Sequence, residues 1–508
     1  MQVPQGQQDL TAARGATRSL VVRNTLYLTA SQVLTVPLAI LSNAVAAHYL
    51  GAEAFGYVYL AFTMCGFGFL AVGWGHEAVL PSVVAQDHSL AGTMLASSIA
   101  WRAALSMVVY VILAFACYLL SYPADLQWAL GLTSLFMALT YVIAACKDTI
   151  RGLERTDIPA YAHVGQQLIA TVLVIAVFVL GGGLRAGLLA QSVACLIVLL
   201  ALWPTLRPVG VGALHVRWSS IKTLLGNGTP FVVFGIAMAL QPNIDALFLS
   251  KLAPIEVMGW YAVSRRLLGA LLLPASALIG ALYPTLCRLH ATDAKDFRRT
   301  TNGALRSVCL LAVPAAIGCA LYPEIGVSLF GRESFGPAED NLRIMAVLLA
   351  LVYFSMPLGT SIMAAGRQKA WSAVQCLCVV TSLLLDPLLV PVFQRRTGNG
   401  GLGLCVAAVI SESVMIGFGV ALAARGVFDG RLGRVILLAL ASGAAMVLAA
   451  QIAKPLTPFI AAPLSVLTYV GALWVTGGLD ENQVASIRAM VGRGFSRLAP
   501  GVSTPWSQ

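Results

Sequence analysis

Seven ionisable side chains lie inside long apolar stretches of this sequence, and they are the residues best placed to do chemistry. They are Arg102, Arg265, Arg266, Arg306, Asp245, Asp386 and Glu412. An ionised group in hydrocarbon is costly, so such residues usually face a protein interior and mark a structural ion pair or a transport path. A guanidinium can bind an oxygen anion through paired hydrogen bonds, whereas a buried carboxyl can take up a proton or hold a cation. The set therefore favours electrostatic recognition rather than bond-making chemistry.

The stretch from Pro230 to Leu286 carries the densest part of this set. Asp245 lies six residues before Lys251 near the end of one apolar run, and Arg265 lies in the next run. At ~1.5 Å per residue, both groups lie about 9–10 Å deep from the same side, so they can meet in an antiparallel hairpin. They form either a structural ion pair or a proton- or substrate-responsive pair facing a cavity. Arg266 points ~100° away from Arg265 around the helix, so it can face the cavity instead.

Composition identifies the elements that must position these residues as membrane-spanning helices. The chain has 508 residues, of which 58% are hydrophobic and 10% are charged, and its mean hydropathy is +0.84. A soluble domain has about 25% charged residues. Apolar windows of about 18 or more residues predict an all-α polytopic protein with about fourteen spans. The predicted spans are 25–47, 56–80, 95–120, 126–146, 160–181, 184–204, 229–251, 258–286, 304–329, 341–364, 370–393, 401–424, 432–452 and 457–477.

Lys and Arg residues are dense and sparse in alternate loops, which predicts the orientation of the chain. Twenty-two fall on the side that holds both termini and seven on the other, with Arg102, Arg265 and Arg266 set aside as intramembrane. The positive-inside rule makes the first side cytoplasmic, so we expect both termini there. The net charge of +11 does not indicate nucleic-acid binding, because no basic cluster outside a span has interleaved aromatic residues.

Three landmarks recur about 203 residues apart and divide the first twelve spans into two related lobes. The matching pairs are Gly56 with Gly259, Pro81 with Pro284, and Arg102 with Arg306. Six spans per lobe make a parallel repeat. We therefore predict two six-helix lobes with two extra C-terminal helices. The predicted parts are a cytoplasmic tail at 1–24, an N-lobe at 25–204, a cytoplasmic linker at 205–228, a C-lobe at 229–424, two accessory spans at 425–477 and an amphipathic cytoplasmic tail at 478–508.

The motif from Leu50 to Tyr57 resembles a motif of the polysaccharide (Wzx-type) oligosaccharide flippases of the MOP exporter superfamily. Further resemblances, in the order and spacing of that family, are Ile150 to Arg155, Asp245, Gly259 to Tyr261, Tyr283-Pro284 and Gly401 to Glu412. Together these motifs cover most of the first twelve spans. The resemblance implies two lobes around a central cavity that opens alternately to each side of the membrane.

The resemblance also implies a function without enzymatic activity. The implied cargo is a polyprenyl-diphosphate-linked oligosaccharide, moved from the cytoplasmic to the outer leaflet of a bacterial inner membrane for O-antigen, capsule or exopolysaccharide biosynthesis. The implied partners are membrane lipids, a polysaccharide polymerase and assembly proteins.

Alternatives on the same fold are a cation-coupled multidrug antiporter and a flippase for a lipid-linked peptidoglycan precursor. A membrane-embedded polysaccharide polymerase is a further alternative, although the predicted outer loops are short. The chain has no phosphate loop ending in Gly-Lys-Ser/Thr, so it does not use ATP by itself. The basic intramembrane residues favour an anionic cargo.

The matching positions of Arg102 and Arg306 predict a clamp for the cargo diphosphate, because two guanidinium groups can bind it through paired hydrogen bonds. The alternative is that both side chains reach the cytoplasmic interface as topology anchors. Arg265 and Arg266 are further candidates for binding the anionic cargo.

Asp245, Asp386 and Glu412 are candidates for gating or for coupling to Na⁺ or H⁺, and the alternative for each is pairing with polar neighbours. A polar lining for the sugar is predicted at Gln32, Asn43 and Gln241, and other amides that could serve it are Gln166, Gln167, Gln191, Asn243 and Gln375. We expect no metal and no cofactor apart from the coupling ion, because the ten cysteines mostly lie in apolar runs and none forms a C-x-x-C pair.

Overall fold

The computed structural model of the chain consists of helices joined by short connections. It describes residues 5–206 and 215–478, with side chains except at 5–30, 32–33, 233–234 and 237–243. Within these ranges there are seventeen α-helices, one short 3-10 helix and no strand, as the predicted all-α class requires. The predicted amphipathic tail lies outside the described residues.

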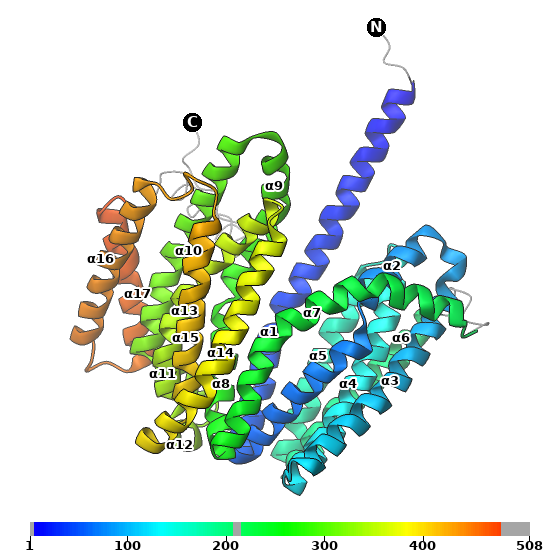
Figure 1. Ribbon diagram of the computed structural model, residues 1–508, viewed down its shortest axis with the longest axis horizontal. Coiled ribbons are helices and arrows are strands. Elements are labelled where there is room, and N and C mark those ends of the chain that lie inside the picture. Colours follow the sequence, from blue (N-terminus) through cyan, green and yellow to red (C-terminus); the bar gives the residue numbers. More distant parts are fainter. Residues whose placement is uncertain (1–4, 207–214, 479–508) are drawn as a thin grey trace, which may run out of the picture. The chain divides into compact units, whose positions relative to one another are not determined.

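The helices follow one another in the order labelled in Figure 1. Their bounds are α1 Gln5–Gly73, α2 His76–Gln86, η1 His88–Leu90, α3 Ala91–Leu119, α4 Ala124–Gly152, α5 Asp157–Val179, α6 Leu184–Leu206, α7 Trp218–Leu252, α8 Ile255–Leu271, α9 Leu273–Thr292, α10 Ala294–Leu321, α11 Pro323–Ser328, α12 Arg332–Phe335, α13 Ala338–Ala364, α14 Gln368–Thr397, α15 Gly401–Leu422, α16 Gly430–Ile452 and α17 Pro458–Val475.

The helices confirm the prediction of about fourteen spans. Eleven candidates are long and apolar enough to cross a membrane, and α8 with α9 makes a twelfth. The first of the eleven contains two predicted spans, separated by a break in α1 at Gly51, and α7 corresponds to the predicted seventh span. Gly51 has φ 72° and ψ 177°, a conformation that glycine adopts far more easily than other residues.

Two predicted spans differ from the observed helices. The expected continuous span at 258–286 is interrupted at Leu272, because Pro274 in the first turn of α9 has no N–H to donate into α8. The seventh span, expected from 229, belongs to a helix that already begins at Trp218.

The described chain divides into two compact units. Unit 1 comprises Met1–Ala270, Gly326–Met345 and Ser372–Val414, and unit 2 comprises Leu271–Ile325, Ala346–Trp371 and Met415–Gln508. This division does not follow the predicted lobe boundary, because α7 packs against α1, α2 and α3. The sequence repeat and the packing units are therefore different divisions of the chain.

Unit 1 is built on α1, which packs against α3, α4, α5 and α7. Figure 1 shows α3, α4, α5 and α6 running side by side, and these helices share a core that includes Leu95, Ile143, Cys195 and Leu202. Apolar burial of this kind supplies the packing contacts, while the helical backbone satisfies its own hydrogen bonds in lipid.

Two glycines that match in the sequence repeat allow α1 and α8 to approach closely. A β-carbon at Gly56 would collide with the Ile255 carbonyl, and one at Gly259 would collide with the Ala52 carbonyl. Small residues allow this kind of backbone approach in membrane helix pairs. The shared glycines therefore fix the start of α8 against α1, and α8 carries Arg265 and Arg266.

Unit 2 contains α10, α16 and α17 packed together (Figure 1). The Tyr469 hydroxyl on α17 donates to the Leu310 carbonyl on α10 at 2.9 Å, and the Tyr322 and Ser465 hydroxyls are 2.9 Å apart. The two predicted accessory spans are therefore α16 and α17, and both pack on α10.

Candidate functional site

A cavity of about 590 Å³ lies within unit 1, between α1, α4, α5, α6 and α8. Its size falls in the range of ligand pockets, about 300–1,000 Å³. Phe62, Phe136 and Phe178 form part of an apolar wall. Hydroxyl, amide and cationic side chains form the remainder, and we call this space the unit 1 cavity. Its polar lining residues are Ser42, Asn43, Tyr59, Thr63, Thr140, Lys147, His163, Gln166, Gln167, Gln191 and Arg266.

The amides of the unit 1 cavity come from three helices. Asn43 is on α1, Gln166 and Gln167 are on α5, and Gln191 is on α6. The Asn43 side chain donates to the Ala39 carbonyl at 2.7 Å, and Gln166 donates to the Cys195 sulfur at 3.3 Å. An amide carries two donor hydrogens and an acceptor oxygen, so these bonds leave hydrogen-bonding capacity for a ligand.

The cationic groups of the unit 1 cavity are Lys147 and Arg266, and none of its described lining residues is acidic. The Arg266 guanidinium lies 5.2 Å from the Phe55 ring centroid. In the described part of the chain, Arg266 forms no ion pair within 4.0 Å. A guanidinium held on an aromatic face without a counter-charge is suited to an oxygen anion.

Two hydrogen bonds hold α8 to the segment that follows α11. The Ser264 hydroxyl donates to the Ala338 carbonyl, and the Trp260 indole donates to the Ser334 carbonyl, both at 3.0 Å. Ser264 directly precedes Arg265 and Arg266 in the chain. These bonds therefore restrain the turn of α8 that carries both arginines.

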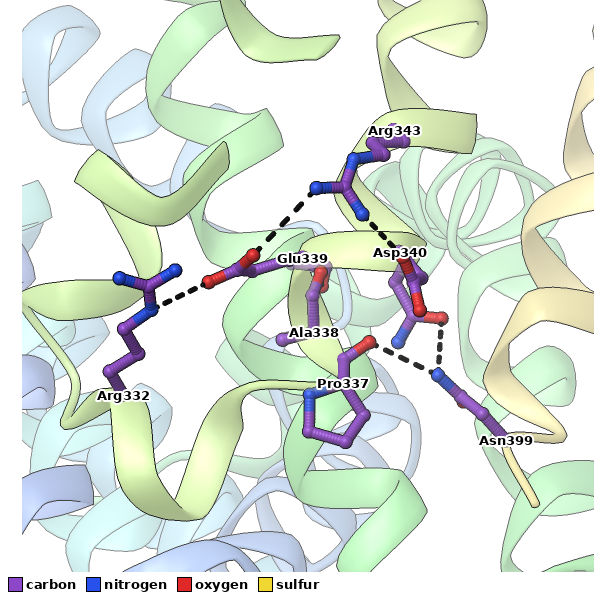
Figure 2. A network of polar contacts seen from close by, with 9 residues as sticks. Arg332, Pro337, Ala338, Glu339, Asp340, Arg343 and Asn399 are labelled. Atoms are coloured by element: carbon purple, nitrogen blue, oxygen red, sulfur yellow. Dashed lines mark hydrogen bonds and ion pairs between the residues drawn. The ribbon is translucent and has the colours of Figure 1, made fainter. Parts of the chain in front are cut away.

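The segment that restrains α8 is itself fixed by the polar network in Figure 2. Arg332 and Arg343 approach Glu339 from opposite sides, with N···O distances of 3.1 and 3.8 Å. The Asn399 amide donates to the Pro337 carbonyl at 3.1 Å and links this segment to the start of α15. This network supports α8 from outside the cavity.

Asp245 on α7 and Asp386 on α14 form a buried carboxyl pair. Their exposed fractions are 5% and 1%, and the Asp245 carboxyl acts electrostatically on Asp386. Both Asp386 oxygens and one oxygen of Asp245 have no hydrogen-bond partner among the described residues. Two adjacent carboxyls in an apolar interior are not both ionised without a neutralising charge, and a proton, a cation or the nearby Arg265 can supply it.

The predicted partner of Asp245 was Arg265, and the structure gives a different arrangement. Arg265 is close enough to act electrostatically on Asp245, but no ion pair within 4.0 Å joins the two among the described contacts. The Asp245 carboxyl instead acts electrostatically on Asp386, which is on α14. Asp245 therefore belongs to a carboxyl pair with a cation nearby.

The Arg102 guanidinium bonds to residues in the core of unit 1. Its guanidinium lies 3.3 Å from Asp148 and donates to the Tyr141 carbonyl at 2.6 Å. Arg151 lies 3.6 Å from the other oxygen of Asp148. The predicted diphosphate clamp needs a guanidinium free to meet a ligand, whereas this arrangement gives Arg102 a structural role.

The other predicted site residues lie in several places. Arg306 is half-buried on α10 and lines a separate cavity of unit 2. Glu412 is buried on α15 and acts electrostatically on Cys378. The side chains of Gln32 and Gln241 lie outside the described part of the structure. No group of three or more His, Cys, Asp or Glu side chains in the described residues is arranged to hold a metal ion.

Comparison with known proteins identifies the family. Residues 21–290, more than half of the chain, match the family described as "Polysaccharide biosynthesis protein". The chain belongs to this family. It is also 21% identical over 385 residues to a Shigella flexneri protein named "Putative O-antigen transporter", an alignment that covers 72% of this chain and 90% of that protein.

Solved structures show the same fold. A structure of the lipid II flippase MurJ in an inward closed conformation has a TM-score of 0.68 and 14% identity, covering 89% of this chain and 98% of the other. An inward-facing multidrug resistance MATE family transporter of the MOP superfamily has a TM-score of 0.62 and 15% identity, covering 78% and 97%. The chain therefore shares the fold of this flippase and this transporter, with many helices long and apolar enough to cross a membrane.

Proposed function

We propose that this protein is a transporter that flips a polyprenyl-diphosphate-linked oligosaccharide from the cytoplasmic to the outer leaflet of a bacterial inner membrane. The flipped lipid would supply the synthesis of a surface polysaccharide, in concert with a polymerase and assembly proteins. The observation that carries the proposal is Arg266, a guanidinium without an ion-pair partner in the described residues, at a cavity lined by amides and hydroxyls.

The cargo has a polar and an anionic part, and the unit 1 cavity has groups for both. The oligosaccharide offers hydroxyls that can exchange hydrogen bonds with Asn43, Gln166 and Gln191. The diphosphate offers oxygens that Arg266 can bind through two parallel N–H groups, with Lys147 as a second cation. A polar cavity of this kind lowers the desolvation penalty that otherwise prevents a sugar from crossing hydrocarbon.

The positive charge of the cavity also argues against the nearest alternative. A multidrug antiporter for cationic compounds would need acidic groups at its cavity, whereas the described lining contains two cations and no acid. A lipid-linked peptidoglycan precursor shares the diphosphate chemistry. It is therefore included as a competing cargo in the test.

We further propose that transport is coupled to H⁺ or Na⁺ at Asp245 and Asp386. Exchange of the ion held by this pair would change its charge, and α7 and α14 would then favour different arrangements. Arg265 acts electrostatically on Asp245, and Arg265 and Arg266 both lie on α8. A change in the charge of the carboxyl pair therefore changes the electrostatic force on the helix that carries Arg266. This route links the coupling ion to the cargo-binding residue.

The test is flipping of a fluorescent polyprenyl-diphosphate oligosaccharide by the purified full chain in proteoliposomes. A charge-assisted hydrogen bond contributes about 1.5–3 kcal/mol, so Arg266→Ala should lower flipping about 10- to 100-fold. Arg266→Lys should fall between, because lysine keeps the charge but loses the planar fork. The matched control is Arg185→Ala, an exposed arginine whose pair with Asp125 is 3.9 Å long.

Equal flipping by Arg266→Ala and the control would rule out Arg266 as the diphosphate ligand. Faster flipping of the lipid-linked peptidoglycan precursor than of the oligosaccharide lipid would assign the alternative cargo. Efflux of a cationic drug without flipping of either lipid would assign the antiporter.

A further inference from the structure

Unit 2 contains a cavity of about 640 Å³ whose lining is strongly cationic, and we call it the basic pocket. Its cations are Lys295, Arg298, Arg299 and Arg306 from α10, with Arg431 and Arg434 from α16. One carboxylate, Asp429, lines the same space, and Gly477 and Gly478 form an edge after α17. The basic pocket is therefore a site of unit 2 alone, separate from the unit 1 cavity.

The α10 cations share one helix face. Lys295, Arg299, Asn302 and Arg306 are spaced three or four residues apart, so their side chains lie above one another. Like charges at this spacing repel. Among the described contacts, no cation of the basic pocket has an ion-pair partner within 4.0 Å. An anion bound in the pocket would relieve this repulsion.

The single carboxylate of the pocket is already engaged as a helix cap. Asp429 accepts from the Leu432 backbone N–H at 2.8 Å and from the Asn302 amide at 3.0 Å. The Leu432 N–H lowers the pKa of Asp429 below its ordinary value, so this group stays ionised at neutral pH. Its hydrogen bonds fix the start of α16 against α10, and they leave the six cations largely uncompensated.

Two buried polar atoms of the pocket lack partners within the described part of the protein. Asn302 is only 4% exposed and its Oδ1 accepts no hydrogen bond, while the Nε of Arg306 donates none. Buried polar atoms in folded proteins nearly always have a partner. A ligand with phosphate oxygens for Arg306 and a hydroxyl for Asn302 would satisfy both atoms.

The pocket also has an apolar end. Leu310, Val435 and Leu438 line it next to the cations, one helical turn further along α10 and α16. A soluble anion would leave this apolar surface in contact with water, whereas the glycerol and first acyl carbons of a phospholipid would cover it. Along α10, the hydroxyl-accepting Asn302, the cationic Arg306 and the apolar Leu310 follow one another, in the order headgroup hydroxyl, phosphate and acyl chain of a phosphatidylglycerol.

We propose that the basic pocket binds the phosphate-glycerol headgroup of an anionic phospholipid. The positive-inside rule places the amino-terminal ends of α10 and α16, which carry most of these cations, on the cytoplasmic side. Anionic lipids there attract basic segments at about 1 kcal/mol per Lys or Arg. The proposal gives the accessory helix α16 a role that the sequence repeat does not explain. It does not depend on the identity of the transported cargo.

The test is lipid binding to the purified full chain, titrated by native mass spectrometry with phosphatidylglycerol and, separately, phosphatidylcholine. Arg306→Gln/Arg434→Gln should weaken phosphatidylglycerol binding about 30-fold, which is about 2 kcal/mol at 1.4 kcal/mol per factor of ten. Phosphatidylcholine binding to the same sample should not change, which also shows that the variant is folded. The matched control Arg395→Gln/Arg396→Gln removes two exposed arginines of α14 and should leave both affinities unchanged.

Three results would overturn the proposal. Equal phosphatidylglycerol binding by the pocket and control variants would show that the pocket is not the site. Displacement of the lipid by millimolar pyrophosphate, with pyrophosphate binding lost in the pocket variant, would assign a soluble anion instead. The acids Asp480 and Glu481 follow the pocket edge in the sequence. If lipid binding occurs only in Asp480→Asn/Glu481→Gln, the occupant is the chain's own carboxyl-terminal segment.

Discussion

Replacement of Arg102 by Leu should destabilise the protein strongly, because it leaves a buried carboxylate without its main counter-charge. Arg102 is 2% exposed and Asp148 is 3% exposed, and they lie 3.3 Å apart. After the substitution Asp148 would keep only Arg151, which is 3.6 Å away and 39% exposed. The Tyr141 carbonyl would also lose the hydrogen bond that it accepts from Arg102.

The expected magnitude follows from the burial of this pair. Removal of one partner of a buried ion pair costs about 3–5 kcal/mol, whereas replacement of both by apolar residues is often close to neutral. Arg102→Leu should therefore lower the free energy of unfolding by about 3–5 kcal/mol, and Arg102→Leu/Asp148→Leu should recover most of that loss. The control Arg185→Leu breaks an exposed pair and should cost no more than about 1 kcal/mol.

The assay is equilibrium unfolding in mixed SDS and detergent micelles, followed by tryptophan fluorescence, with flipping measured on the same preparations. Additive losses in the double variant would refute the ion-pair interpretation, because independent residues do not compensate each other. Normal stability with abolished flipping in Arg102→Leu would instead support the diphosphate clamp that the sequence predicts.

Two further substitutions test other parts of the structure. Asp386→Asn removes one member of the carboxyl pair, so flipping should lose its dependence on the H⁺ or Na⁺ gradient while cargo binding persists; a gradient dependence equal to that of the unmodified protein would exclude the pair from coupling. Gly259→Ala places a β-carbon against the Ala52 carbonyl and should lower the free energy of unfolding by about 1–3 kcal/mol. Gly269→Ala on the same helix meets nothing within 4 Å and should be neutral or stabilising, and equal losses in both variants would contradict the close approach of α1 and α8.

The fold could be predicted from the sequence because each span is encoded locally. A run of apolar residues long enough to cross hydrocarbon becomes a helix regardless of its neighbours, since only a helix satisfies its backbone there. The break within the predicted eighth span is also encoded locally, by Pro274, but a count of apolar residues does not detect it. The division into packing units depends on long-range contacts such as those of α7 with α3, which no local pattern records.

Partners of the intramembrane charges were harder to predict than the charges themselves. A hairpin predicts Asp245 and Arg265 as neighbours, whereas the structure shows no ion pair within 4.0 Å between them and brings the Asp245 carboxyl close enough to act electrostatically on Asp386 of α14. Asp148 was missed as the partner of Arg102, although an acid between Lys147 and Arg151 was a visible signal.

The unit 1 cavity was only partly visible in the sequence. Asn43 and three glutamines were recognised as possible sugar ligands, but Lys147 was interpreted as a topology signal and His163 was not noticed. Which polar residues of separate helices face the same space depends on helix rotation and packing. A single sequence does not fix these quantities for helices with apolar residues on all sides.

The most direct measurement is site-specific photo-crosslinking of the cargo in cells that synthesise a lipid-linked oligosaccharide. A photoreactive residue in place of Gln167, at the unit 1 cavity, should capture the polyprenyl-diphosphate oligosaccharide, and Arg266→Ala should abolish the capture. The same residue in place of Leu196, exposed on the outside of α6, should capture only bulk phospholipid. Equal capture of the oligosaccharide lipid at both positions, or capture that persists without Arg266, would contradict cargo binding in this cavity.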